Sequence, residues 1–130
     1  MRLWPEPPGA TDAWRAYLRA YDRAGNDPYV GRCLVQLLHE AGAEPRRNSS
    51  VFFVACAGNE KFARLVNNMV GIMSGAREAV LRYGLCDPTY YDAALEAFRK
   101  WGKRPDAAFW YGICWAEGVR GTGTDVARSS

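Results

Sequence analysis

The segment from Asp27 to Gly42, DPYVGRCLVQLLHEAG, constrains the fold of this chain more than any other. Apolar residues recur in it at helical spacing, at Val30, Cys33, Leu34, Leu37, Leu38 and Ala41. This spacing gathers them into one stripe of an α-helix with about 3.6 residues per turn. Asp27 and Pro28 supply a start signal, and Gly42 suits the left-handed residue that closes a helix. We therefore predict one amphipathic helix over this segment.

The remaining sequence predicts further helices and two strands. Thr11 or Asp12 can cap a first helix that ends at Gly25–Asn26 and has a stripe formed by Trp14, Tyr17, Leu18 and Tyr21. Ser50–Cys56, SVFFVAC, is apolar on both faces, which predicts an interior strand covered from two sides. A helical excursion over Asn59–Gly102, restarting at Asp87-Pro88, separates it from a second strand at Ala107–Glu117. The small, polar segment 121–130 is expected to be a disordered tail.

Composition limits the classes of protein to consider. At 130 residues, 48% of them hydrophobic and 24% charged, the chain has the length and character of one globular domain. Its net charge of +3 is scattered, whereas nucleic-acid binders concentrate basic residues on one face, so we expect no nucleic-acid partner. No apolar run reaches the roughly 20 residues that span a bilayer, and no signal peptide is evident, so we expect no membrane partner. The four cysteines form no CxxC pair, which predicts a reduced, cytoplasmic protein without a metal site.

Several stretches, taken in order, resemble one family. These are PEPP (Pro5–Pro8) followed by a Trp- and Tyr-bearing helix, Gly25–Gly42 with its Gly31-Arg32 pair, SVFFVAC, the Asn59–Gly102 excursion, and the segment from Pro105 to Glu117. Together they resemble the C-terminal half of a class I S-adenosylmethionine-dependent methyltransferase of the small-molecule type. The resemblance implies that the chain begins near the fifth strand, that SVFFVAC is the sixth, and that the last strand is antiparallel. The excursion resembles an insertion over the substrate pocket.

The resemblance predicts an α/β protein with a partial Rossmann-like methyltransferase fold. Its helices accompany a C-terminal antiparallel strand pair, which the helical insertion interrupts. Residues 1–120 correspond to the substrate-side part of one methyltransferase domain. The family binds S-adenosylmethionine with a glycine-rich turn in its first half, and this chain has only Gly9 before Gly25, so no cofactor-binding residue is assigned.

The missing half has consequences for partners and activity. Strands that normally join a prebuilt sheet would carry open edges, so we expect a homodimer, a complementing chain or marginal stability. S-adenosylmethionine is the cofactor by family, but we do not expect it to bind this truncated chain alone. Methyl transfer depends mainly on orienting a small-molecule substrate, so no catalytic residue is assigned and the chain alone is expected to be inactive.

Candidate substrate-binding residues follow from side-chain chemistry, each with a structural alternative. Arg32 could reach an anion, or it could pair with Asp27; Asn67 could bind substrate, or it could mark the outer face of its helix. Aromatic residues could line an apolar pocket or belong to the core: Trp14, Tyr17, Tyr29, Trp110 and Tyr111. His39, the only histidine, lies off its helix's apolar stripe, so no catalytic triad is expected. The alternative function is a non-catalytic helical module that binds a small molecule or a protein.

Overall fold

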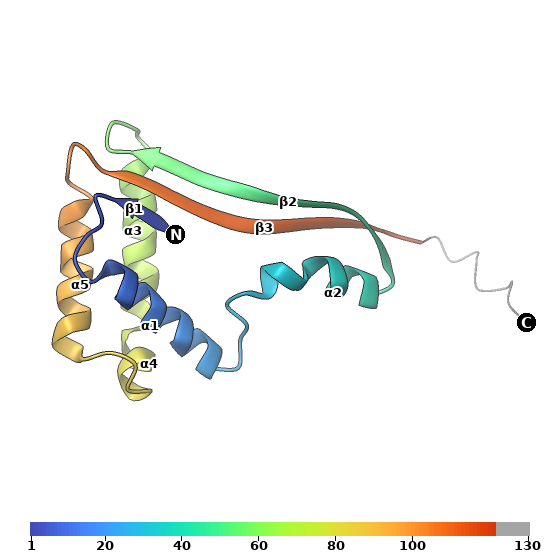
Figure 1. The fold of residues 1–130 in the computed structure, drawn as a ribbon, viewed down its shortest axis with the longest axis horizontal. Coiled ribbons are helices and arrows are strands. Elements are labelled where there is room, and N and C mark those ends of the chain that lie inside the picture. The colour runs from blue at the N-terminus through green and yellow to red at the C-terminus, as the bar shows by residue number, and fades with distance from the viewer. Residues whose placement is uncertain (122–130) are drawn as a thin grey trace, which may run out of the picture. The chain divides into compact units, whose positions relative to one another are not determined.

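The computed structural model describes residues 1–121 of the chain, so the predicted tail at 122–130 lies outside the described residues. Its elements are, in order, β1 (Arg2–Trp4), α1 (Ala10–Arg23), the 3₁₀ helix η1 (Val30–Cys33), α2 (Leu34–Glu40), β2 (Ala43–Cys56), α3 (Phe62–Gly75), α4 (Arg77–Arg82), α5 (Pro88–Trp101) and β3 (Ala108–Arg120) (Figure 1). The chain divides into two compact units. Unit 1 contains Met1–Pro28 and Phe53–Tyr111, and unit 2 contains Tyr29–Phe52 and the segment that begins at Gly112.

The three strands form an open antiparallel sheet in the order β1-β3-β2. β1 pairs with the start of β3, where Leu3 lies opposite Phe109 and Trp4 opposite Ala108. The predicted strand pair, separated in sequence by a helical excursion, is therefore confirmed. β3 extends to Arg120, well beyond the three residues that face β1, so only β2 accompanies its later part.

β2 differs from the predicted interior strand. It begins at Ala43 rather than Ser50, and it lies at the edge of the described sheet. All four residues from Val51 to Val54 are exposed, so the prediction that the run is covered on both faces is wrong. An apolar run is typical of an interior strand, but nothing in residues 1–121 pairs with the outer side of β2. Pro45, which has no N–H to donate, is compatible with an edge strand.

The core of unit 1 forms where α1, α3, α4 and α5 pack together. α1 contributes small residues to it, Ala10, Ala13, Ala16 and Ala20, and these allow close approach of the neighbouring helices. The larger residues predicted to form its apolar stripe lie beside this face: Trp14 and Tyr17 are half-buried and Tyr21 is exposed. α1 also begins without a side-chain cap, at Gly9, so the predicted cap at Thr11 or Asp12 is wrong.

α3 and α5 run side by side and supply the large core residues (Figure 1). The Trp101 ring contacts Phe98 and Phe62, with centroid distances of 5.6 and 5.4 Å. The predicted start of α5 is confirmed, since the Asp87 carboxylate accepts a hydrogen bond from the Tyr90 N–H at 3.0 Å and Pro88 occupies the first turn. These local signals and the buried aromatic residues fix α5 in unit 1.

In unit 2, the predicted Asp27–Gly42 helix is broken into a 3₁₀ turn and an α-helix of seven residues. Neither η1 nor α2 contains a fully buried residue, so the predicted stripe does not become a core. The physical reason lies at Gly31, which approaches β3 so closely that an added Cβ would lie 2.7 Å from Cys114 Cβ. Packing therefore sets the local backbone path. The predicted end is confirmed, because Gly42 has a φ of 78°.

Candidate functional site

The candidate aromatic residues are brought together only in part. Trp14 and Tyr17 from α1 lie with their ring centroids 5.0 Å apart, and Tyr111 from β3 meets Trp14 edge-on at 6.1 Å. We call these three half-buried residues of unit 1 the aromatic cluster. Burial raises the pKa of Tyr17, with smaller contributions from Tyr111 and Tyr21. The cluster therefore combines apolar ring faces with phenol hydroxyl groups.

Trp110 does not join the aromatic cluster. It is exposed, whereas its neighbours Phe109 and Tyr111 are buried and half-buried. Successive side chains of a strand point to opposite faces, which accounts for this separation. Its proposed role in lining a common pocket with Tyr111 is therefore not supported by its placement.

Tyr29 and Arg32 lie together in unit 2, at the start of η1. The Arg32 guanidinium lies over the Tyr29 ring at 5.0 Å from its centroid, and Arg32 Nε donates to the Tyr29 carbonyl oxygen at 3.3 Å. Both side chains are exposed. Arg32 thus stabilises its own turn, and its role in binding an anion stays a prediction.

Asn67 lies on the outer surface of α3, in a shallow hollow of unit 1 with a volume of about 470 Å³. The other residues lining this hollow are mostly polar or charged, and they come from α3, α5 and the turn that follows: Ala63, Val66, Glu96, Arg99, Lys100, Gly102 and Lys103. Since Asn67 is exposed, both its outer-face interpretation and a binding role remain compatible with this position.

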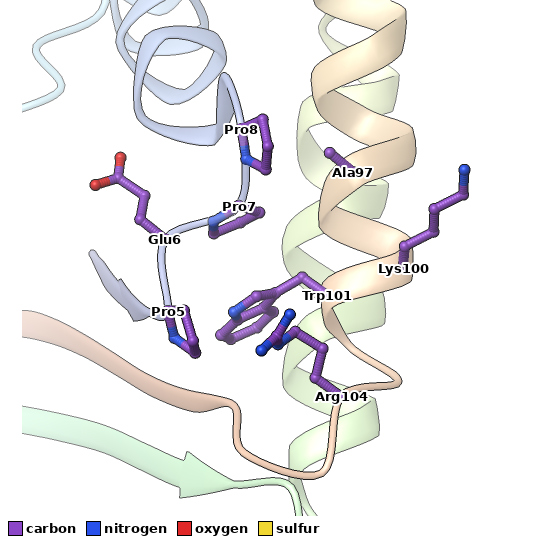
Figure 2. A pocket seen from close by; sticks show the side chains of 8 residues that line it. All are labelled: Pro5, Glu6, Pro7, Pro8, Ala97, Lys100, Trp101 and Arg104. Carbon is purple, nitrogen blue, oxygen red and sulfur yellow. The ribbon is translucent and has the colours of Figure 1, made fainter.

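A second hollow of unit 1, which we call the Trp101 pocket, was not anticipated from the sequence. Its volume is about 320 Å³, and it is lined by Pro5, Glu6, Pro7, Pro8, Ala97, Lys100, Trp101 and Arg104. Figure 2 shows the Pro5–Pro8 segment facing the Trp101 indole, with the Arg104 guanidinium close to the ring. In the sequence, Pro5–Pro8 indicates a connection between elements and Trp101 indicates the end of a helix. The basic residues beside Trp101, Lys100, Lys103 and Arg104, are the signal that could have indicated a site.

Some polar groups of the Trp101 pocket have hydrogen-bond partners, and one buried donor has none. Arg104 donates from Nε and Nη2 to the two carboxylate oxygens of Asp106, each at 2.8 Å. This pairing raises the pKa of Arg104 and lowers that of Asp106. Glu6 accepts a hydrogen bond from the Thr11 hydroxyl. Trp101 is only 3% exposed, and its Nε1 has no hydrogen-bond partner among residues 1–121.

Groups of possible metal ligands and the state of the cysteines can be read directly from residues 1–121. Within the described residues, no three His, Cys, Asp or Glu side chains gather as metal ligands, and all four cysteines are free. His39, the only histidine, is exposed on α2.

No helix among residues 1–121 has the length and apolar character needed to cross a bilayer.

Comparison with known proteins does not assign the chain to a family. No protein-family model matches it, and no curated protein matches it.

Proposed function

We propose that this chain is the substrate-side half of a class I S-adenosylmethionine-dependent methyltransferase, which works with a cofactor-binding half that these 130 residues do not contain. The proposal starts from the order of segments that resemble the family, from Pro5–Pro8 to the last strand. In this proposal β1 is the end of the fifth strand, β2 is the sixth and β3 is the last.

The sheet carries the proposal. Its final strand, β3, is antiparallel to β1 and lies between β1 and β2, as an antiparallel last strand added to an existing sheet would. The outer side of β1, where the earlier strands would join, has no strand partner in the described chain, and beyond Trp110 neither does the β1 side of β3. A two-stranded ribbon is marginal in water and unpaired edges attract other strands, so this sheet is suited to being completed by another polypeptide.

The residues of this chain do not suit the cofactor itself. The turn between β1 and α1 carries Pro5, Pro7 and Pro8, which have no backbone N–H groups, where a dinucleotide-type turn needs glycines that let the backbone approach its ligand. The proposal therefore gives cofactor binding to the missing half. The chain would hold the methyl acceptor, for which the aromatic cluster of Trp14, Tyr17 and Tyr111 offers ring faces and hydroxyl groups.

The contribution to catalysis would be orientation. Holding an acceptor in line with a methyl group converts a bimolecular step into an effectively unimolecular one and needs no side-chain nucleophile. The proposal expects acceptor binding to survive in the isolated chain and cofactor binding to be absent from it.

Calorimetry tests whether the cofactor binds this chain or the cofactor-binding half. S-adenosylmethionine is titrated into the chain alone, and into the chain mixed with the isolated cofactor-binding half of a small-molecule class I methyltransferase. We expect no binding to the chain alone and tighter cofactor binding to the mixture than to the added half alone. Stoichiometric micromolar binding to the chain alone would contradict the proposal.

A matched pair of variants locates the joining surface. Trp4→Lys places a charge on the exposed part of β1, and Ile72→Lys places one on the exposed side of α3. We expect Trp4→Lys to abolish the gain in cofactor binding and Ile72→Lys to leave it unchanged. Equal effects of both variants would argue against completion of the sheet at β1.

The coding sequence upstream of Met1 gives an independent check. An in-frame segment that encodes a glycine-rich strand-turn-helix unit would supply the missing half on the same polypeptide. An upstream sequence that encodes a different type of domain would count against the proposal.

A further inference from the structure

We propose that the Trp101 pocket binds a small carboxylate with an apolar, preferably aromatic, body. The inference is independent of the proposed methyltransferase role, because no residue lining this pocket is among the candidate acceptor-binding residues. It rests on three features of the pocket: its apolar walls, an unsatisfied buried donor, and a cation at its edge.

The walls define the body of the ligand. Most of the lining is apolar, and it comes from Pro5, Pro7, Pro8, Ala97 and the Trp101 ring. Proline has a fixed φ and little conformational freedom, so this wall is largely formed before a ligand arrives. A volume of about 320 Å³ is at the lower end of the range for small-molecule pockets, which limits the ligand to about the size of a single ring with a short substituent.

The buried donor defines one functional group of the ligand. An indole N–H can only donate, so a partner for Trp101 Nε1 must be an acceptor. Leaving a buried donor unsatisfied costs about 1–3 kcal/mol, and such groups are rare in folded proteins. In Figure 2 the nitrogen lies on the edge of the ring that faces the Pro5–Pro8 segment. The atom is closed to water in this conformation, so an acceptor reaches it through a small movement of the pocket wall.

The cation defines the charge of the ligand. Arg104 engages Asp106 through Nε and Nη2, which leaves Nη1 without a partner in the described chain. Lys100 forms no ion pair within residues 1–121, and Figure 2 shows the ends of the Glu6 and Lys100 side chains directed away from the indole. Because Asp106 offsets much of the Arg104 charge, the pocket suits a single negative charge rather than a phosphate dianion. A carboxylate offers one such charge and two acceptor oxygens, enough for Arg104 and the indole N–H together.

Two-dimensional ¹H–¹⁵N NMR of the full chain tests the inference directly. The five tryptophans give separate indole N–H signals, and Trp101→Phe identifies the signal of Trp101 while keeping an aromatic ring against Phe62 and Phe98. Benzoate is the probe, with benzyl alcohol and inorganic phosphate as neutral and dianionic comparisons. We expect benzoate to move the Trp101 signal in a saturable way, and the other two to move it at least about tenfold less at equal concentration.

Arg104→Gln and Arg99→Gln form a matched pair. Both remove a cation from an exposed position in or just beyond α5, but only Arg104 lines the Trp101 pocket. We expect Arg104→Gln to weaken benzoate binding about tenfold or more and Arg99→Gln to leave it unchanged. Circular dichroism of each variant confirms that the fold is retained, and Arg104→Gln keeps the test decisive if Trp101→Phe does not fold.

Three results would overturn the inference. The first is an unmoved Trp101 signal at about 10 mM benzoate, a concentration that detects even millimolar affinity. The second is an equal loss of binding in the two arginine variants, which would indicate general charge attraction. The third is an equal response to phosphate or benzyl alcohol, which would indicate an anion site or an apolar site without recognition of a carboxylate.

Discussion

Tyr91 shows how one side chain joins two helices at the residue scale. It is fully buried on α5, and its hydroxyl donates to the Met73 carbonyl oxygen of α3 at 2.8 Å. Carbonyls in the last turn of a helix lack partners within the helix, so Tyr91 satisfies one of them. Burial raises the pKa of Tyr91 to about 12, with smaller contributions from Cys86, Tyr17 and Asp92.

The Tyr91 pKa predicts a loss of stability at alkaline pH. The phenol has a higher pKa in the folded chain than its ordinary value of 10.0, so its contribution is complete below pH 10 and is lost as the pH rises towards 12. Two pKa units correspond to about 2–3 kcal/mol. We expect the free energy of unfolding to fall by up to that amount over this interval relative to Tyr91→Phe.

Urea denaturation at several pH values measures this difference. At neutral pH, Tyr91→Phe should be about 1 kcal/mol less stable than the natural chain, because the Met73 carbonyl loses its donor. The two stabilities should converge above pH 10 and then cross, so that near pH 12 the natural chain is less stable than Tyr91→Phe by about 1–2 kcal/mol. Tyr83→Phe, at the end of α4, serves as the control for general tyrosine ionisation. Stability curves for Tyr91→Phe and the natural chain that stay parallel up to pH 12 would contradict the assignment.

The candidate site illustrates what residue chemistry can and cannot predict. Side-chain chemistry predicts five aromatic candidates, and the structure brings three of them together, Trp14, Tyr17 and Tyr111. The Trp101 pocket was missed, because an unpartnered indole N–H and a facing proline segment arise from contacts more than 90 residues apart in sequence. No local pattern encodes such a contact.

At the scale of elements, local sequence signals determine where α5 begins. Asp87 caps the helix through the Tyr90 N–H, and Pro88 fills the first turn, where no hydrogen bond is lost. We expect Asp87→Ala to destabilise unit 1 by about 1 kcal/mol, since α5 supplies much of its core. Asp87→Ser, which keeps a capping oxygen, should recover most of the loss in thermal denaturation. Equal stability of the alanine and serine variants would show that the cap contributes nothing.

The contrast with η1 and α2 explains where sequence prediction fails. The signals for α5 act within one helix, and its start and end were predicted correctly. The Asp27–Gly42 helix carries equally regular spacing, yet it breaks where Gly31 packs against Cys114 in β3. Helical spacing reports a preference for an apolar face, and it does not report which neighbour that face will meet.

Gly31→Ala separates two influences on η1, its intrinsic helix preference and its packing against β3. The two predict changes in stability of opposite sign. Replacing glycine by alanine in an unpacked helix stabilises it by up to about 1 kcal/mol. At Gly31 the added Cβ would lie 2.7 Å from Cys114 Cβ and 2.9 Å from its Sγ, so we expect Gly31→Ala to destabilise unit 2 instead. Gly71→Ala on α3, where nothing lies within 4 Å of the added atom, should be stabilising.

Hydrogen exchange measures both substitutions. Faster exchange is expected at the amides of η1 and α2 in Gly31→Ala, and slower exchange in α3 of Gly71→Ala. Should Gly31→Ala also slow exchange in η1, intrinsic helix preference would outweigh packing there, and the explanation for the broken helix would be wrong.

At the scale of the whole molecule, the sequence predicted the strand pair but not its surroundings. The pairing of β2 with β3 follows from two β-rich runs on either side of a helical excursion, and the resemblance implied an antiparallel last strand. The exposure of Val51–Val54 could not be predicted from the sequence. An apolar run of this kind is typical of a buried strand, but no segment of the described chain pairs with the outer side of β2. Such a mismatch between composition and burial marks a surface that favours a partner.

The exposed part of β2 predicts concentration-dependent self-association when no other partner is present. Phe52 and Val54 are 67% and 57% exposed and lie two residues apart on a strand with an unpaired edge. Pairing two such edges would satisfy backbone groups and bury apolar side chains together, whereas a lysine at the edge opposes it. We expect light scattering to give a mass that rises above 14.5 kDa with concentration for the natural chain. Val54→Lys should stay near the mass of one chain.

Ile72→Lys is the control for this surface, because Ile72 is an exposed apolar residue on a helix, α3, rather than on a strand. It should associate as the natural chain does. If association depended only on exposed apolar area, both lysine variants would reduce it equally. That result would show that the β2 edge is not the association surface. A natural chain that stays monomeric at every concentration would carry the stronger implication. The exposed apolar run of β2 would then be stable in water without a partner, and the inference that its exposure marks an association surface would be wrong.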